Sequence, residues 1–241
     1  KGYIFLLIKI FYRVLGMENV VGSQIVNVLY VFGIAGMVMG SLHAIWEQDT
    51  RRMIAYSSVA QIGYIYMGIG LGTQAGMAAA VFHIFTHSAT KALLFISAVG
   101  LYEVSGDKKD FRSLRGAAYR NPLAGFGFAV GALSMVGFPM LSGFISKLLF
   151  ATAALRSPGK MILTLLVLAV STTLNAIYFL RLVITLYSRQ NVCRKEETET
   201  ETRNSWNLRI SILCFIGLNL VLGLASQPTV QAIGDGLSMF G

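Results

Sequence analysis

The chain has 241 residues, of which 55% are hydrophobic and only 13% are charged, and its mean hydropathy is +0.64. An average soluble domain is about 25% charged, so this composition excludes both a soluble globular domain and a disordered chain. The net charge of +9 does not indicate nucleic-acid binding, because the 20 Lys and Arg residues lie mostly in short segments between long apolar runs. We therefore expect an all-α, polytopic integral membrane protein.

The two cysteines lie in different environments. Cys193 falls in a polar segment and Cys214 in an apolar run, so we expect neither a disulfide nor a cysteine-based metal site. The chain begins at Lys1 without a methionine, a signal-peptide charge pattern or a cleavage site, and its first residues already have the composition of a membrane helix. We therefore expect it to be the downstream part of a longer protein.

Seven apolar stretches define the predicted membrane spans. A helix needs about 20 apolar residues to cross the hydrocarbon core, and 1–16 falls short of that length. The predicted loops are 47–52, 102–121 and 188–206, and the tail 227–241 is mildly polar. In chain order the predicted spans are 1–16, 24–46, 53–72, 75–101, 122–156, 161–187 and 207–226.

The stretch 122–156 permits two interpretations. The pair Asn121-Pro122 is a good helix start, since proline is tolerated at the first helical position. The segments GFP at 137–139 and SG at 142–143 then interrupt the apolar run. The stretch is either two separate spans or one discontinuous helix whose ends meet in mid-membrane.

The distribution of basic residues favours the discontinuous helix. With a single broken span, the loops 47–52, 102–121 and 188–206 lie on one side of the membrane and carry eleven Lys and Arg residues. The other side then has Arg156, Lys160 and, near the first stretch, Arg13. This bias is stronger than two separate spans would give, and it follows the positive-inside rule. We therefore predict about seven spans, one of them interrupted at 122–156.

Three ionisable residues recur at helical spacing within the span 75–101. A charged group at the bilayer centre costs about 2.5–3.5 kcal/mol on insertion scales, so it is a functional candidate by default. His83, His87 and Lys91 lie at i, i+4 and i+8, which places them on one stripe over about 12 Å of helix. Imidazoles titrate near neutrality, so we predict a chain of proton-holding sites. The alternative is a set of satisfied interhelical hydrogen bonds.

Lys147 follows the interruption in 122–156. Broken helices in transporters place free backbone groups and binding residues near the midplane, so we predict a gated proton site there; the alternative is a lysine that extends to the membrane surface. For His43, close to Trp46, and for Arg181, near the end of 161–187, the interfacial interpretation is favoured.

Metal and cofactor chemistry is not expected. The His83–His87 spacing resembles a zinc pair, but the metalloprotease motif needs Glu after the first histidine, and Ile84 stands there. No third ligand, nucleophile–base set or cofactor motif is visible, so we assign no catalytic, cofactor-binding or metal residues. No Asp or Glu lies deep in a span. Either these cationic groups are often neutral, or an acidic partner comes from a missing segment or a partner subunit.

Three segments in order carry a family resemblance: QDTRRMIAYSSVAQIGYI at 48–65, FHIFTHSATKALLF at 82–95 and GFPMLSGFISKLLF at 137–150. Together they resemble the antiporter-like membrane subunits of respiratory complex I (NADH:quinone oxidoreductase), of Mrp-type sodium/proton antiporters and of energy-converting hydrogenases. The resemblance covers essentially 1–187. It implies two inverted repeats, each with one broken helix.

The resemblance also implies how the chain is divided. It makes the whole of 1–241 a single transmembrane domain, with 1–46 as the end of the first repeat region, 53–187 as the second repeat and 207–226 as a terminal helix. We expect the earlier helices of the family to be absent from this sequence.

By the same resemblance, Lys1 would link two half-channels, His83, His87 and Lys91 would be central relay residues, and Lys147 would be the terminal proton site. The chain has Asp49-Thr50-Arg51-Arg52 where the family usually has Asp-Leu-Lys-Arg. The lysine in the broken helix favours the shorter lysine-bearing members, including the Mrp D type.

We therefore expect a subunit of a larger membrane complex, in a bacterial-type cytoplasmic membrane, that translocates protons or exchanges them for sodium. Its expected partners are other membrane subunits, lipid, H⁺ and Na⁺, and not nucleic acid. The host complex could be a translocase of the NADH:quinone oxidoreductase type. In that case we expect this chain to be a subunit that carries out no redox chemistry itself. The alternative is a non-conducting structural or assembly subunit, or a truncated remnant. The coupled ion, the host complex and the oligomeric state are left open.

Overall fold

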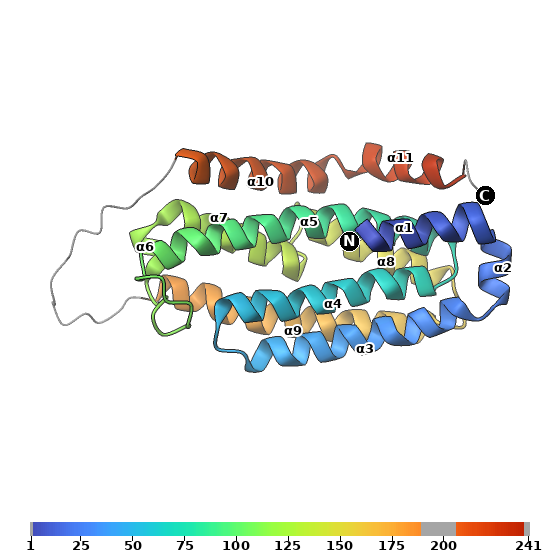
Figure 1. Ribbon diagram of the computed structural model, residues 1–241, viewed down its shortest axis with the longest axis horizontal. Helices are drawn as coiled ribbons and strands as arrows, with labels where there is room; N and C mark the ends of the chain where they lie inside the picture. Colours follow the sequence, from blue (N-terminus) through green and yellow to red (C-terminus); the bar gives the residue numbers. More distant parts are fainter. Residues whose placement is uncertain (1, 189–205, 239–241) are drawn as a thin grey trace, which may run out of the picture.

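The computed structural model describes residues 2–188 and 206–238, and over these residues the fold is all helical (Figure 1). One isolated bridge joins Asp49 to Asp110. In chain order the helices are α1 Gly2–Ile10, the π-helical η1 Phe11–Leu15, α2 Met17–Gly22, α3 Ile25–Trp46, α4 Thr50–Gly70, α5 Gln74–Glu103, α6 Ala117–Arg120, α7 Pro122–Val136, α8 Ser142–Leu155, α9 Met161–Tyr187, α10 Trp206–Leu224 and α11 Ser226–Ser238.

Long apolar helices run along the length of the molecule, as expected for a multi-pass membrane protein. Among the described helices α3, α5, α9 and α10 are long and apolar enough to cross a membrane, with mean hydropathy between 1.4 and 2.0. α4 has 21 residues but is more polar. Most of its side chains are buried among its neighbours, which shields them from lipid. The predicted all-α membrane fold is confirmed.

The predicted discontinuous helix is also confirmed. α7 and α8 are apolar helices of 15 and 14 residues, separated by the link 137–141. Asn121 accepts the backbone N–H of Ala124 and caps α7, as the Asn121-Pro122 pair predicts. At the other end Gly137 adopts φ 95°, a left-handed conformation that stops the helix and that glycine takes without strain.

α3 and α4 pack with their backbones in direct contact. A Cβ added at Gly63 would lie 2.6 Å from the carbonyl oxygen of Gly33, and one added at Gly40 would lie 2.5 Å from the backbone nitrogen of Ala60. Small residues at a helix interface permit this approach, which is the usual way that membrane helices associate. α4 packs in turn against α5.

Helix boundaries differ from the predicted ones mainly at the ends. The stretch 161–187 is α9 as predicted, whereas α4 begins three residues before the predicted 53–72 because Asp49 caps it. The stretch 1–16 is divided between α1 and η1. For the tail 227–241 the sequence predicts only mild polarity, yet most of it forms α11, which continues along the line of α10 on one side of the bundle (Figure 1).

Candidate functional site

The stripe on α5 is buried at the centre of the bundle. Thr73 caps the helix by accepting the N–H of Gly76 at 3.1 Å, and the alanine-rich sequence that follows favours a long uninterrupted helix. His83, His87 and Lys91 are 5%, 2% and 6% exposed. The structure thus places all three predicted residues inside protein and away from lipid.

The histidine end of the stripe contacts the broken helix. His83 Nδ1 lies 2.6 Å from the hydroxyl of Ser146 on α8. The His83 and His87 rings stack with their centroids 5.7 Å apart, and Phe150 packs at 5.4 Å with its ring tilted against His83. Ser146 directly precedes Lys147, so this contact joins the stripe to the helix that carries Lys147.

The lysine end of the stripe contacts α4. Lys91 Nζ donates to the carbonyl oxygen of Ile54 at 2.7 Å and to the hydroxyl of Ser57. The ring of Phe179 on α9 lies 5.9 Å away. A buried ammonium needs such acceptors because it is expensive to remove from water, and here those acceptors are electrically neutral.

Lys147 turns back onto the break in the discontinuous helix. Its Nζ donates to the carbonyl oxygens of Met135 at 3.0 Å and Val136 at 2.5 Å, which belong to the last turn of α7. These carbonyls carry the negative end of the helix dipole and have no partner within the helix. The amino group therefore lies at the break and does not extend to a loop.

A polar cluster that the sequence analysis missed lies beside the break. The Asn219 amide oxygen on α10 accepts hydrogen bonds from the hydroxyls of Thr90, Ser134 and Ser142. The serines belong to α7 and α8, and Thr90 precedes Lys91 on α5. The only sequence signals were serines on both sides of the interruption and Asn219 in the middle of the apolar run 207–226.

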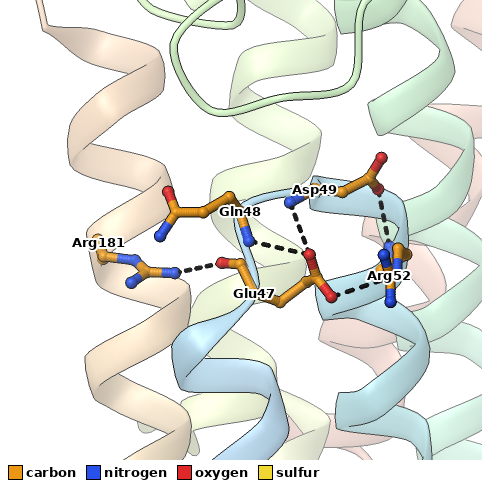
Figure 2. Close-up of polar contacts among 5 residues, drawn as sticks. All are labelled: Glu47, Gln48, Asp49, Arg52 and Arg181. Atoms are coloured by element: carbon orange, nitrogen blue, oxygen red, sulfur yellow. Dashed lines mark hydrogen bonds and ion pairs between the residues drawn. The ribbon is translucent and has the colours of Figure 1, made fainter.

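A second polar group lies at the end of the bundle, around the link between α3 and α4 (Figure 2). Glu47 pairs with Arg52 at 3.2 Å and accepts the backbone N–H groups of Gln48 and Asp49. Arg181 points from α9 to this link, where it donates to the carbonyl oxygen of Glu47 at 2.7 Å. Arg181 thus lies at the end of the bundle, in agreement with its interfacial interpretation.

His43 is exposed near the end of α3, and its Nδ1 lies 2.8 Å from the carbonyl oxygen of Met39. Lys1 and Cys193 lie outside the described residues. Within residues 2–188 and 206–238, no group of three or more His, Cys, Asp or Glu side chains is placed to hold a metal ion.

Comparisons with known proteins agree on one family for this chain. Residues 4–174 match the family described as NADH:quinone oxidoreductase/Mrp antiporter, TM. The N-type subunit of NADH-quinone oxidoreductase from Desulforudis audaxviator is 35% identical over 179 residues, which cover 73% of this chain and 35% of that protein. The D-type subunit of the Na⁺/H⁺ antiporter from Alkalihalophilus pseudofirmus is 30% identical over 203 residues, covering 82% of this chain and 39% of that protein.

A solved structure gives the same fold. The Mrp complex of Dietzia sp. DQ12-45-1b contains a chain that superposes with a TM-score of 0.84 at 24% identity, covering 98% of this chain and 50% of that one. The chain therefore spans between about a third and a half of the length of these relatives.

Proposed function

This chain belongs to the NADH:quinone oxidoreductase/Mrp antiporter transmembrane family, and from that premise we propose that it passes protons across the membrane as a subunit of a larger complex. In this proposal 53–187 is one repeat of the family's fold, and the chain works with other membrane subunits in a bacterial-type cytoplasmic membrane. Proton transfer alone and exchange of protons for sodium both fit the proposal, and the test below separates them.

The observation that carries the proposal is the contiguity of the buried groups. Ser146 links α8 to His83, His83 stacks on His87, and Lys91 lies one helical turn beyond His87. Because the ring centroids of the two histidines are 5.7 Å apart, a proton would pass between them through a water molecule or a ring rotation. Lys147, which follows Ser146 on α8, is the remaining group of the proposed relay and lies at the break.

The chemistry of the partners supports transfer of protons. Lys147 donates to two backbone carbonyl oxygens, and these neutral acceptors leave no stranded anion when the ammonium loses its proton. Interacting titratable groups in a low-dielectric interior influence one another strongly, so a charge change at one group alters the next. Lys1, which lies outside the described residues, would extend the relay beyond α5.

Proton flux in membrane vesicles tests the proposal. The chain would be produced together with its neighbouring membrane subunits, and His87→Ala and Lys147→Ala would be compared with wild type by the quenching of a pH-sensitive dye. We expect proton flux to fall at least about tenfold in each variant, since a missing relay group removes a transfer step. His43→Ala is the matched control, because His43 is exposed and distant from the stripe in the sequence.

The outcomes separate the candidate functions. Full flux in both variants would contradict the relay. Absence of flux in the wild-type assembly, with normal assembly of its partners, would favour a structural subunit. Proton movement driven by an imposed sodium gradient would identify sodium/proton exchange, and its absence would leave proton transfer alone.

A further inference from the structure

We propose that Asn219 is a positioning residue that holds both halves of the broken helix in register against α5; this inference rests on the proposed function. Asn219 lies on α10, beyond residues 4–174 that match the family. Its amide oxygen lies 2.8 Å from the Thr90 hydroxyl, 2.9 Å from that of Ser134 and 2.8 Å from that of Ser142. None of these four side chains is more than 2% exposed.

The direction of the Asn219 amide is fixed by its own helix. Its Nδ2 donates to the carbonyl oxygen of Phe215 at 3.1 Å, one turn earlier on α10, so the oxygen faces the other helices. The Thr90 hydroxyl also lies 2.8 Å from the carbonyl oxygen of Thr86, so it keeps an acceptor when Asn219 is removed. Ser134 and Ser142 would then have each other at 3.3 Å in place of the shorter contacts with Asn219, and weaker hydrogen bonding is costly in a dry interior. One side chain therefore secures contacts from α5, α7 and α8.

The positions of these hydroxyls tie the cluster to the relay. Thr90 directly precedes Lys91, and Ser134 directly precedes Met135, whose carbonyl oxygen accepts from Lys147. Ser142 is the first residue of α8, the helix that carries Lys147. A shift of α7 or α8 at this cluster would move the carbonyls of Met135 and Val136 relative to the amino group that they hold.

A second contact places α10 against the same break. A Cβ added at Gly223, one turn beyond Asn219, would lie only 2.2 Å from the carbonyl oxygen of Met140 in the link 137–141. Met140 itself adopts φ 73°, a left-handed conformation that a residue with a side chain takes only when its surroundings enforce it. The link is thus pressed onto the backbone of α10, independently of the hydrogen bonds of Asn219.

Amide hydrogen exchange of the assembled complex, measured by mass spectrometry in lipid nanodiscs, tests the proposal without relying on transport. In Asn219→Leu, which keeps the size of the side chain but lacks the acceptor, we expect exchange to rise several-fold in 133–146. Other helices should keep their wild-type exchange. Leu218→Ala is the control, because Leu218 is 42% exposed on the neighbouring position of α10 and should change nothing at the break.

Transport supplies the second measurement. Misplacement of a reacting group by about 1 Å can reduce a rate by as much as a hundredfold, so we expect proton flux in Asn219→Leu to fall at least about tenfold. Asn219→Gln keeps both an amide oxygen and an N–H donor and should recover normal exchange at 133–146 and a large part of the flux. Recovery by this variant separates positioning from a general loss of structure.

Two results would overturn the inference: unchanged exchange at 133–146 in Asn219→Leu, or a uniform rise across all helices. Loss of flux in Lys147→Ala with full flux in Asn219→Leu would also reject the role of Asn219 while leaving the relay intact. Conversely, a local rise of exchange in Asn219→Leu, together with full flux in Lys147→Ala, would reject the relay but keep the structural link.

Discussion

Lys91 and Lys147 lie inside the bundle and donate to backbone carbonyls and a hydroxyl, whereas Arg52, at the end of the bundle, pairs with the carboxylate of Glu47 (Figure 2). The sequence has no Asp or Glu between residues 50 and 102 or between 111 and 195. A buried ion pair carries a large desolvation penalty, while a pair at the surface costs and gains little.

The charge of a lysine's hydrogen-bond partner decides what is left behind when the lysine loses its proton. Loss of a proton from a lysine that is paired with a carboxylate would leave a buried, unpaired anion. Loss of a proton from Lys147 leaves two neutral carbonyls instead. Under the proposed function, the buried region would undergo the change of charge, and the polar end of the bundle would keep its charges.

The largest expected effect is on the packing of the break. A Cβ added at Gly143 would lie 1.8 Å from the carbonyl oxygen of Ser134, so Gly143→Ala forces α7 and α8 apart. We expect a loss of about 3 kcal/mol of stability, measured by thermal unfolding in detergent. Gly217→Ala on α10 is the control, because nothing lies within 4 Å of its added Cβ. Equal stability of the two variants would contradict the tight break.

The Ser57 hydroxyl on α4 accepts a hydrogen bond from the amino group of Lys91. Ser57→Ala removes this hydroxyl, and hydrogen bonds to charged groups contribute about 1.5–3 kcal/mol. We expect proton flux to fall about tenfold in vesicles with normal amounts of protein. In the control Ser97→Ala, flux should stay at the wild-type level, since the Ser97 hydroxyl has no hydrogen-bond partner among the described residues. A similar fall in both variants would disprove a specific role for Ser57.

The membrane spans could be predicted because their signals are local. Apolar length defines a span, the Asn121-Pro122 pair marks the start of α7, and glycines, proline and serines mark the break. The stripe on α5 follows from helical spacing alone. α11 was missed because polar residues dominate its sequence, although Val230, Ile233 and Leu237 have the i, i+3, i+7 spacing of an amphipathic helix.

The partners of the ionisable groups could not be predicted in the same way. Which hydroxyl meets Asn219, or which carbonyl meets Lys147, depends on how each helix is rotated about its axis. Rotation is set by packing against neighbouring helices, and hydropathy does not encode it. The contact of Arg181 with Glu47 shows the same limit, because it joins residues 134 positions apart.

A smaller effect is expected at the polar end of the bundle. Arg181 donates to the Glu47 carbonyl oxygen and lies 4.7 Å from the ring of Phe111. Arg181→Gln should reduce stability by about 1 kcal/mol, the usual size of a partly exposed hydrogen bond or cation–π contact. Proton flux should stay at the wild-type level. A tenfold loss of flux with normal stability would extend the relay to this end and remove the contrast between the two regions.

The smallest effect is expected for the loop that packs on this end. The backbone N–H and the hydroxyl of Ser113 donate to Asp110 and hold the pKa of its carboxyl below the usual value. Since a lowered pKa stabilises the folded loop only where the carboxyl is ionised, this contribution is complete above about pH 4. It is lost only as pH falls through the lower, folded-state pKa. Ser113→Ala should therefore leave the pH dependence of proton flux unchanged between about pH 5 and 8. A displaced profile would show that the loop takes part in transport, whereas an unchanged one shows that Asp110 and its partner Ser113 do not set the pH dependence.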